Sequence, residues 1–422
     1  MLFRPLVRSL VRPLIRSPLE SRGLRPTLSL DFTNGGVTDS RVTYSGGANG
    51  TRVNSEGLIV AATTPRFDYN PVTLAPLGLL VEEARTNLAL HSQEFDNAVY
   101  NKSTVTVTAD ATIGPDGATT ADKLITDASA GYHNINQSIG SRVASVAYTY
   151  SFYAKAAEIG FCLPNINSGL TGSQIQALIN LTTGEVSSVS VGLTATTQNA
   201  GNGWWRVYLT AIGDSNTTGF LATINTADET GNPNFTGNGS DGIYIWGFQI
   251  EQGSFPTSYD PTTTAALTRT ADSGIISGAA FTAFYNQAGG SAVVQFDLTA
   301  VSGTRPIISF DDNTANERIE LYASGTDLRM KVVDGGATQV DMSIGTVAAN
   351  TTYKAAIAWA ANDFAGCLNG GTVATDSSGT LPTPDRLRIG SDQAGNFQCG
   401  HDKTLQAFAQ RLPNATLQGM TA

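Results

Sequence analysis

Residues 147–156 read Ala-Tyr-Thr-Tyr-Ser-Phe-Tyr-Ala-Lys-Ala, and this stretch decides the fold class. Its even-numbered positions are apolar or aromatic, namely Tyr148, Tyr150, Phe152 and Ala154, while Thr, Ser and Lys occupy most of the odd ones. Successive side chains of a β-strand point to opposite faces, so this alternation predicts an antiparallel strand with one buried face.

Short runs of the same kind recur along the chain, bracketed by Gly, Asn, Asp or Ser and with no long helical segments between them. In the first half they lie at 104–113, 147–156, 204–212, 219–226 and 242–251, and in the second half at 293–298, 306–310, 318–322, 327–333, 352–359 and 387–390. Asp-Gly-Gly at 334–336 adds a hairpin signal. Many short strands without intervening helices are typical of sandwiches. We therefore predict an all-β protein with two antiparallel β-sandwich domains of jelly-roll or lectin-like type, preceded by an extended arginine-rich N-terminal arm.

The charge and the apolar content of the chain limit the classes of partner that it is expected to bind. Charged residues make up 14% of the chain, and the formal net charge is −10 although residues 1–25 carry six Arg and a single acidic residue. An acidic body disfavours broad nucleic-acid binding, so no specific nucleic acid is expected. No run reaches the roughly 18 apolar residues that a membrane span needs, so no membrane partner is expected.

The basic N-terminus has its own pattern. Arg4, Arg8, Arg12 and Arg16 recur every four residues, but interspersed prolines disfavour the α-helix that would align them on one face. Such an arm has almost no core of its own. We expect these arginines to anchor the protein to a particle; the alternative is a tail that docks on nothing.

The same patterns divide the chain into five segments. Residues 26–86 begin with a strand-like run at 28–32 and are then rich in Gly and Pro, which is typical of an extended β connector. Residues 263–288, rich in Thr and Ala, are expected to be a linker. The predicted segments are a basic arm at 1–25, the connector at 26–86, a first sandwich at 87–262, the linker at 263–288 and a second sandwich at 289–422.

The sequence motifs that could indicate catalysis or cofactor binding do not lie next to the secondary structure that such a function requires. The G-x-G-x-x-G at 237–242 precedes a strand-like run, whereas a dinucleotide-binding motif must follow a strand and open a helix. Glu82 and Glu83 are neighbours that would face opposite sides of an extended chain, and Arg85 is a sufficient partner for them. We therefore expect no enzyme activity, no catalytic residue, no cofactor and no metal cluster.

Three cysteines at wide spacing, Cys162, Cys367 and Cys399, fit neither a disulfide framework nor a zinc site. We expect free thiols. A disulfide between Cys367 and Cys399 in an extracellular particle is the alternative.

Glycan binding needs aromatic faces for the C–H surfaces of sugars and short polar side chains for their hydroxyls, held on a rigid scaffold. Two loops have this composition, although each is also a reasonable ordinary polar turn, and the oxygens of the second also suit Ca²⁺. The four tryptophans lie in strand-like runs and are expected in the core. The candidate glycan-binding residues are Tyr132, His133 and Asn134 in the first loop, and Asp311, Asp312 and Asn313 in the second.

Two motifs bracket the first predicted sandwich. They read Gly-Leu-Leu-Val-Glu-Glu-Ala-Arg-Thr-Asn-Leu at 78–88 and Trp-Gly-Phe-Gln-Ile-Glu-Gln-Gly-Ser-Phe-Pro-Thr-Ser-Tyr at 246–259. In both, the chain resembles phage and gene-transfer-agent surface proteins of the head-spike-fibre or tail-fibre type. There they flank a domain similar to a carbohydrate-binding-module jelly roll, one inner strand of which is similar to Gly-Trp-Trp-Arg-Val at 203–207. The runs at 353–359, 368–371 and 387–390 resemble a concanavalin-like or laminin-G-like sandwich.

This resemblance implies a structural protein on the surface of a virion, a head spike or a tail fibre. It would be anchored through its N-terminus to other virion proteins, such as a capsid vertex, a spike base or the tail, and attach to host cell-surface polysaccharide. A homo-oligomer is expected, because repeated copies convert weak sugar affinity into avidity. One alternative is a decoration or connector protein that binds no sugar, and another is a polysaccharide-degrading tailspike.

Overall fold

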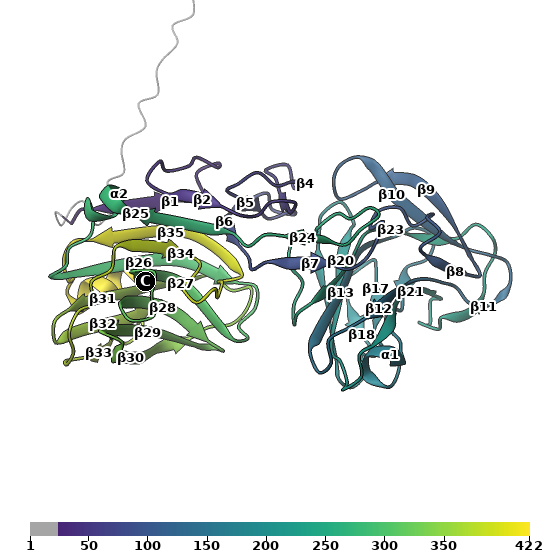
Figure 1. Cartoon of the computed structure of the whole chain (residues 1–422). Coiled ribbons are helices and arrows are strands. Elements are labelled where there is room, and N and C mark those ends of the chain that lie inside the picture. The colour runs from purple at the N-terminus through teal and green to yellow at the C-terminus, as the bar shows by residue number, and fades with distance from the viewer. Residues whose placement is uncertain (1–23) are drawn as a thin grey trace, which may run out of the picture.

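The computed structural model describes residues 24–422 and confirms the predicted all-β fold, with antiparallel sheets paired into two β-sandwiches. Figure 1 shows two lobes joined by a narrow waist. None of the helices in the described residues is long and apolar enough to cross a membrane. Arg4, Arg8, Arg12 and Arg16 lie outside the described residues, so their anchoring role stays a prediction.

The lobe that we call the middle sandwich contains two large sheets over one core, with the small pair β11 (Ala130–Tyr132) and β22 (Asn234–Thr236) and the short α1 (Ser168–Thr171) at its margin. The six-stranded sheet has the order β19 (Leu193–Asn199), β20 (Trp205–Ile212), β13 (Ala147–Ala156), β23 (Gly242–Gln252), β10 (Thr119–Thr126) and β9 (Val105–Ile113). The facing sheet contains β16 (Ile175–Gln176), β15 (Asn165–Ile166), β21 (Thr218–Ala227), β14 (Phe161–Cys162), β17 (Leu178–Asn180) and β18 (Val186–Ser187), with β12 (Asn134–Ser141) joining β21 to β8 (Asn101–Ser103).

The alternation of β13 places its side chains as predicted. Tyr148, Tyr150, Phe152 and Ala154 are all buried in the core between the two sheets. Tyr153 lies on the other face, in a second cluster with Trp204, Trp246 and Tyr259. The outer face of this sheet is therefore also partly covered, and the covering comes from the waist.

The lobe that we call the terminal sandwich is built from both ends of the described chain. Its eight-stranded sheet has the order β33 (Ala374–Asp376), β32 (Asp363–Leu368), β31 (Tyr353–Ala360), β26 (Gly289–Leu298), β35 (Gly400–Phe408), β6 (Pro76–Val81) and β5 (Phe67–Tyr69), and β1 (Leu28–Asp31) also pairs with β35. Its seven-stranded sheet has the order β2 (Thr43–Ser45), β25 (Ser273–Ser277), β34 (Arg386–Ile389), β27 (Thr304–Asp311), β28 (Arg318–Ser324), β29 (Asp327–Asp334) and β30 (Ala337–Thr346).

Asp334 ends β29, and Ala337 begins β30, so the Asp-Gly-Gly hairpin prediction is confirmed. Gly335 and Gly336 have φ values of 58° and 80°. Two consecutive left-handed residues are what a tight hairpin turn demands, and glycine adopts them without a steric penalty.

The segments expected as connector and linker belong to the terminal sandwich. Residues 26–86 supply β1, β2, β5 and β6 to its two sheets, together with the hairpin β3 (Thr51–Val53) and β4 (Ile59–Ala61). Residues 263–288 supply β25 and α2 (Gly278–Thr282), and Ile276 and Phe281 lie in the core. Short strands among Gly and Pro lack a readable alternation, which is why these segments resemble loops in the sequence.

The middle sandwich is therefore an insertion in the terminal one. The chain enters it through β7 (Arg85–Asn87) and leaves it through β24 (Leu267–Arg269), and these two strands pair antiparallel with each other. Figure 1 shows β7 and β24 side by side in the waist. The two crossings are thus hydrogen-bonded together.

The C-terminal α3 (Asn414–Thr421) packs on the outer face of the eight-stranded sheet, where Leu417 joins a small cluster with Leu412 and Phe408. Cys162, Cys367 and Cys399 are buried free thiols, as expected, so Cys367 and Cys399 do not form the alternative disulfide. Trp204, Trp246 and Trp359 are each 1% exposed, which confirms them as core residues, whereas Trp205 is partly buried and packs against the edge of the middle-sandwich core.

Candidate functional site

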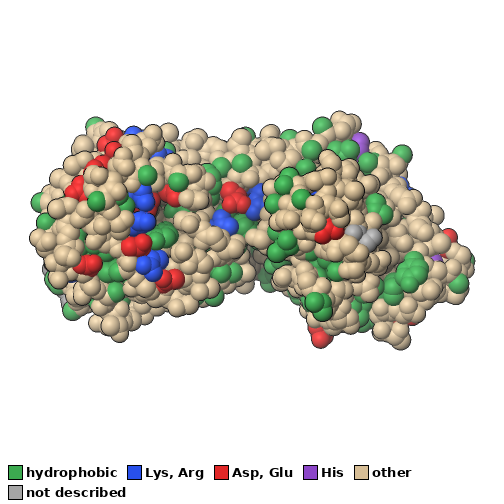
Figure 2. Space-filling view, turned by 60° about the horizontal axis from the view of Figure 1, so that its bottom comes forward, with side chains coloured by type: hydrophobic (Ala, Val, Ile, Leu, Met, Phe, Trp, Pro, Cys, Tyr) green, Lys and Arg blue, Asp and Glu red, His purple; other side chains and the backbone are tan. Residues whose placement is uncertain are grey.

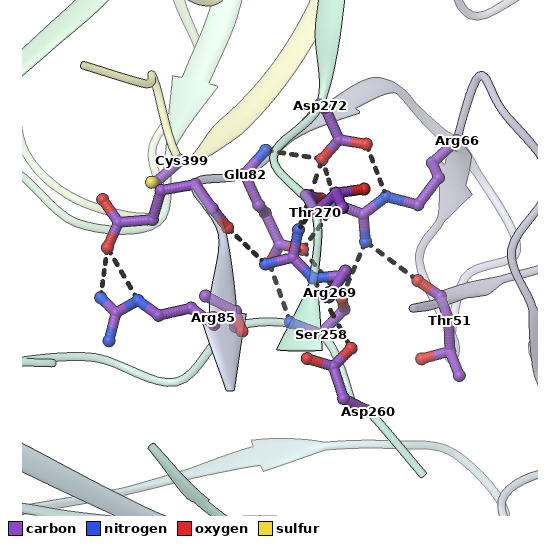
Figure 3. A network of polar contacts seen from close by, with 12 residues as sticks. Thr51, Arg66, Glu82, Arg85, Ser258, Asp260, Arg269, Thr270, Asp272 and Cys399 are labelled. Carbon is purple, nitrogen blue, oxygen red and sulfur yellow. Dashed lines mark hydrogen bonds and ion pairs between the residues drawn. The ribbon is translucent and has the colours of Figure 1, made fainter. Parts of the chain in front are cut away.

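The waist contains a buried network of charges, which we call the joint (Figure 3). Arg66, fully buried, donates to Asp272 through Nε at 3.0 Å and to Glu82 through Nη2 at 2.7 Å. Arg269 lies within 3.5 Å of the same Glu82 carboxylate and donates to the carbonyl of Glu83 at 2.7 Å. Two arginines thus share the carboxylates of one small, dry space.

The joint connects both lobes. Glu82 accepts hydrogen bonds from the backbone N–H and the hydroxyl of Ser258, both at 2.8 Å, and Ser258 leaves the middle sandwich after β23. Asn87 donates to the carbonyls of Phe248 and Asp260 and accepts from the N–H of Ile250 at 3.1 Å. The crossing β7 is therefore tied to β23 and to the strand exit at the same place.

Beside it, Glu83 accepts a hydrogen bond from Arg85 Nε at 2.8 Å and one from Arg305 at 3.1 Å. Glu82 and Glu83 lie between β6 and β7 and have different partners; Arg85, the partner expected for both, pairs with Glu83, whereas Glu82 pairs with Arg66 and Arg269. The same two arginines cover the ring of Phe255, at 4.8 Å and 5.0 Å from its centroid. Two cations close to one buried ring add to the attraction between the lobes.

The surroundings shift the pKa values of two carboxyl groups at the joint, Glu82 and Asp260, in opposite directions. Burial acts to raise the pKa of Glu82, but Arg269 and Arg66 outweigh it and hold that pKa well below its ordinary value. Burial raises the pKa of Asp260 to about 8, with Arg269 opposing it. Neither carboxyl oxygen of Asp260 has a hydrogen-bond partner within residues 24–422, and Arg269 is 3.6 Å away. We therefore assign charge to Glu82 and a neutral acid to Asp260 near pH 7.

The two motifs that carried the resemblance supply part of the joint and of its surroundings. Glu82, Glu83, Arg85 and Asn87 belong to the stretch 78–88, and Ser258 belongs to the stretch 246–259. Arg66, Arg269 and Asp272, which lie outside both motifs, complete the network around Glu82. The polar side chains of the motifs are thus engaged in contacts inside the protein.

Beside the joint lies a cleft of about 420 Å³, the inter-lobe cleft, which is open to solvent. Figure 2 shows the waist where charged side chains gather between the two lobes. The wall on the middle sandwich is the outer face of β19 and β20. The opposite wall comes from β3 and β5, and the loops at Thr299 and Asn350 close one end.

The register of the strands explains the chemistry of the first wall. Thr196 pairs with Tyr208, which pairs with Ser151, and Gln198 pairs with Arg206, which pairs with Tyr153. The intervening residues, such as Val207 and Leu209, point into the core. A half-buried tyrosine is therefore surrounded by hydroxyl and amide side chains on strands that cannot move independently.

Arg206, on β20, lies at the base of this wall. Its Nη2 donates to the carbonyl of Thr257 at 2.7 Å and to the hydroxyl of Ser151 at 3.3 Å, and its guanidinium lies 5.5 Å from the ring centroid of Tyr153. Its Nε is buried and has no hydrogen-bond partner in the described part of the chain. A buried N–H without an acceptor is costly, so the position of Arg206 is maintained by the contacts of its Nη2 and by its packing on Tyr153.

His401 lies across the cleft from Arg206. Its ring contacts Asp297 through Nδ1 at 2.8 Å and Asp68 through Nε2 at 3.2 Å. Burial acts to lower the pKa of His401, but the two carboxylates outweigh it and raise that pKa to about 10. The ring is therefore a cation held between strands β5, β26 and β35, and it stiffens the second wall.

The candidate residues of the first predicted loop lie elsewhere. Tyr132 is 54% exposed at the end of β11. His133 is buried, and its two ring nitrogens contact the carbonyls of Thr104 and Phe235 at 2.7 Å and 3.1 Å. Asn134 begins β12 and pairs within the sheet. Tyr132 is the member of this set that faces solvent.

The candidate residues of the second loop are in the other lobe. Asp311 is fully buried and accepts from Arg388 Nε at 3.0 Å and from the hydroxyl of Ser309 at 2.9 Å. Asp312 accepts from the backbone and hydroxyl of Thr314, and Asn313 accepts from Arg388. These oxygens stabilise the turn itself. Within residues 24–422 no group of three or more His, Cys, Asp and Glu side chains is placed to hold a metal ion.

The sequence did not reveal the cleft, because its walls come from strands far apart in the chain. The available signal was the alternation in Leu-Thr-Ala-Thr-Thr-Gln-Asn at 193–199, which places Thr194, Thr196 and Gln198 on one face. A strand with hydroxyls and amides on one face and apolar residues on the other predicts a polar sheet surface. It does not say what faces that surface.

Comparison with known proteins adds the following. No family model matches the sequence, and no curated protein matches it. Among solved structures, it is similar to the Ruminococcus gnavus IT-sialidase CBM40 bound to α2,3-sialyllactose, with 15% identity, a TM-score of 0.29, and coverage of 32% of this chain and 84% of that one. It is also similar to a heptameric SAP-like pentraxin from Limulus polyphemus, with 14% identity, a TM-score of 0.26, and coverage of 32% and 70%. A third similar structure is the binding domain of botulinum neurotoxin DC in complex with rat synaptotagmin II, with 11% identity, a TM-score of 0.29, and coverage of 36% and 40%. These likenesses extend over about a third of the chain at low scores, and they do not bear on what this chain binds.

Proposed function

We propose that this chain is a non-enzymatic surface protein of a phage-like particle and that it attaches to host glycans through the inter-lobe cleft. The observation that carries the proposal is the wall of β19 and β20, where Tyr208 lies among Thr194, Thr196, Gln198 and Thr210 beside the cleft. An aromatic face packs against the C–H surface of a sugar ring, and hydroxyls and amides exchange hydrogen bonds with sugar hydroxyls. This composition suits an uncharged oligosaccharide.

The joint supports the same function. A shallow sugar site gains affinity when its two walls are already fixed, because binding then costs little conformational entropy. Glu82, Arg66 and Arg269 hold the lobes together through buried contacts next to the cleft. A weak site of this kind becomes effective when many copies are displayed on one particle.

The place of the protein on a virion rests on the resemblance of its two motifs and on its arginine-rich N-terminus, and the expected partners are other virion proteins. Binding without conversion rests on the chemistry of the cleft. The cationic His401 and the buried Arg206 are both held by structural partners.

A glycan array tests this function, with capsule-type and surface oligosaccharides probed by the full chain and by two matched variants. Wild-type protein should bind a defined set of glycans. Tyr208→Ala should lose this binding by about tenfold or more, as expected for removing an aromatic platform worth roughly 1–2 kcal/mol. Tyr132→Ala, an identical truncation at the exposed tyrosine of the first predicted loop, should bind as wild type does.

The outcomes separate the alternatives. Loss of binding in Tyr132→Ala with binding retained in Tyr208→Ala would place the glycan in the loop predicted from sequence and refute the cleft. No binding by any form would favour a decoration or connector protein. Shortened glycans in the wash would favour a polysaccharide-degrading spike.

A further inference from the structure

A second cavity lies on the terminal sandwich and shares no lining residue with the inter-lobe cleft. It measures about 290 Å³ and lies over the outer face of the seven-stranded sheet, under the loop 391–397. We call it the sheet-face pocket. It is lined by Thr304, Pro306, Arg318, Glu320, Tyr322, Ser324, Lys331, Asp392, Gln393, Ala394 and Asn396.

The register of the sheet places opposite charges side by side on this face. Glu320 on β28 is flanked by Ser309 on β27 and by Lys331 on β29, and Lys331 in turn pairs with Asp341 on β30. Figure 2 shows acidic and basic side chains alternating across the lobe on the left. Alternating charges on adjacent strands stabilise a sheet, and here they also line a cavity.

The loop that covers the pocket is locked in place. Asp392 accepts hydrogen bonds from the backbone N–H groups of Ala394 and Asn396, both at 2.9 Å, and from the side-chain amide of Asn396 at 2.7 Å. Ser391 and Phe397 form a bridge across the base of the loop. The carboxylate of Asp392 thus accepts hydrogen bonds from its own loop. These bonds fix the loop, so this wall of the pocket is formed before any ligand binds.

Lys331 is the cation that this arrangement leaves least satisfied. Its Nζ lies 3.8 Å from the carboxylate of Asp341. That carboxylate already accepts from Arg329 Nε at 2.8 Å and from the hydroxyl of Tyr322 at 3.1 Å. The ammonium group therefore has donor capacity to spare at the wall of the pocket.

Gln393 of the covering loop also lines the pocket. Its Oε1 is covered in the unliganded chain and has no hydrogen-bond partner in the described residues, so a rotation of the side-chain amide makes it available as an acceptor. Glu320 accepts from Arg318 Nε at 2.9 Å through one oxygen only. The pocket thus combines the ammonium group of Lys331, which has no close partner within residues 24–422, the acceptors of Gln393 and Glu320, and the ring of Tyr322.

We propose that the sheet-face pocket binds a sugar unit that carries a carboxylate, such as a hexuronic acid in an acidic polysaccharide. Lys331 pairs with the carboxylate, Gln393 accepts from a ring hydroxyl, and Tyr322 supports one face of the ring. The pocket acts separately from the inter-lobe cleft, which is lined by hydroxyls and amides. One copy of the protein then has two glycan sites of different charge preference, one on each side of the terminal sandwich core.

Protonation of Glu320 favours the binding of such an anion at mildly acidic pH. Burial raises the pKa of Glu320 to about 7, with Arg318 and Lys331 opposing the shift and Asp392 adding to it. These three groups and the neutral Ser309 are the ones that face Glu320 from its own strand, from β27 and β29, and from the loop. Below this pKa the side chain is a neutral acid that does not repel a ligand carboxylate, so affinity increases as pH falls from 8 to 6.

The test uses trigalacturonate and its carboxyl-reduced form, which has the same rings without the charge, titrated into the full chain by calorimetry at pH 6. Trigalacturonate should bind, the reduced trisaccharide should bind at least about fivefold more weakly, and Lys331→Gln should lose about tenfold in affinity for trigalacturonate. Lys331→Arg, which keeps the charge, should retain most of it. Lys354→Gln, an equivalent change on β31 in the other sheet, should behave as wild type.

Equal affinity for the two trisaccharides, or a change of less than twofold in Lys331→Gln, would overturn the proposal. Loss of trigalacturonate binding in Tyr208→Ala would also overturn it, because the ligand would then occupy the inter-lobe cleft, and the proposed function would stand. Appearance of mono- or digalacturonate during the titration would show that the trisaccharide is cleaved and would refute simple binding.

Discussion

Removal of Arg66 tests the joint most sharply. Its side chain is fully buried and donates to Asp272, Glu82, the carbonyl of Thr51 and the hydroxyl of Ser258. Arg66→Met keeps much of the apolar volume and removes all of these donors. Two carboxylates then remain in a dry space with one arginine.

The magnitude follows from these contacts. Breaking a buried ion pair by removing one partner costs about 3–5 kcal/mol, because a charge is left uncompensated. Arg269 stays within 3.5 Å of Glu82 and 3.7 Å of Asp272 and takes over part of the compensation. We therefore expect a loss of about 3 kcal/mol in the free energy of unfolding, at the lower end of that range.

The assay is urea unfolding followed by tryptophan fluorescence, which reports on both lobes because Trp204 and Trp246 are buried in the middle sandwich and Trp359 in the terminal one. The matched control is Arg41→Met, whose ion pair with Asp39 is partly exposed and should be worth less than about 1 kcal/mol. A loss below 1 kcal/mol in Arg66→Met, or equal losses in the two variants, would refute the role assigned to the joint.

Two further predictions concern the same region. The His401 pKa is raised from 6.5 to about 10, so its contribution is fully present below pH 6.5 and is lost as pH rises through 10. Between pH 6.5 and 10 wild type should lose about 2–4 kcal/mol more unfolding free energy than His401→Gln, measured by urea titration at each pH; parallel losses would contradict the assignment. Gly253→Ala places a Cβ against the guanidinium of Arg85, which must then leave Glu83 and Phe255. This variant should lower the melting temperature by several degrees, in proportion to about 1–2 kcal/mol, and an unchanged melting temperature would show that Arg85 is free to move.

Much of the strand layout was predictable. The run at 147–156 coincides with β13, and the runs at 242–251 and 327–333 differ from β23 and β29 by a single residue each. In β29 one face packs on a core and the other is half-exposed, so the strand alternates clearly. In β13 and β23 the outer face is also covered, by the cluster around Tyr153 and Trp246, but the apolar residues of the core face still recur at every second position over part of each strand. Apolar residues then recur at every second position of the sequence, which identifies the strand.

The strand β35 was not predicted, although it lies in the middle of its sheet. It begins Gly-His-Asp-Lys at 400–403, and such a run of charges favours a loop. In the structure His401 is held between Asp297 and Asp68, and Lys403 lies 3.1 Å from Asp297. His401 and Lys403 are tolerated in a central strand because carboxylates from distant strands pair with them, and those partners are invisible in a local pattern. Asp402 is also buried, and burial raises the pKa of its carboxyl group, which favours the neutral acid.

The candidate sites show the same limit. Tyr132 was found as an exposed aromatic, but His133 and Asp311 are polar residues whose partners are internal. A list of residue types suited to sugars cannot distinguish a side chain that awaits a ligand from one already hydrogen-bonded. The inter-lobe cleft depends on the insertion of one sandwich into the other, which no local signal encodes.

The most direct test of the account is a crystal structure of the full chain with the oligosaccharide that the array selects most strongly. The account predicts density for a sugar ring against Tyr208, with sugar hydroxyls near Thr196 and Gln198. Density for that glycan at Tyr132, or on any other surface with the cleft left open, would contradict it.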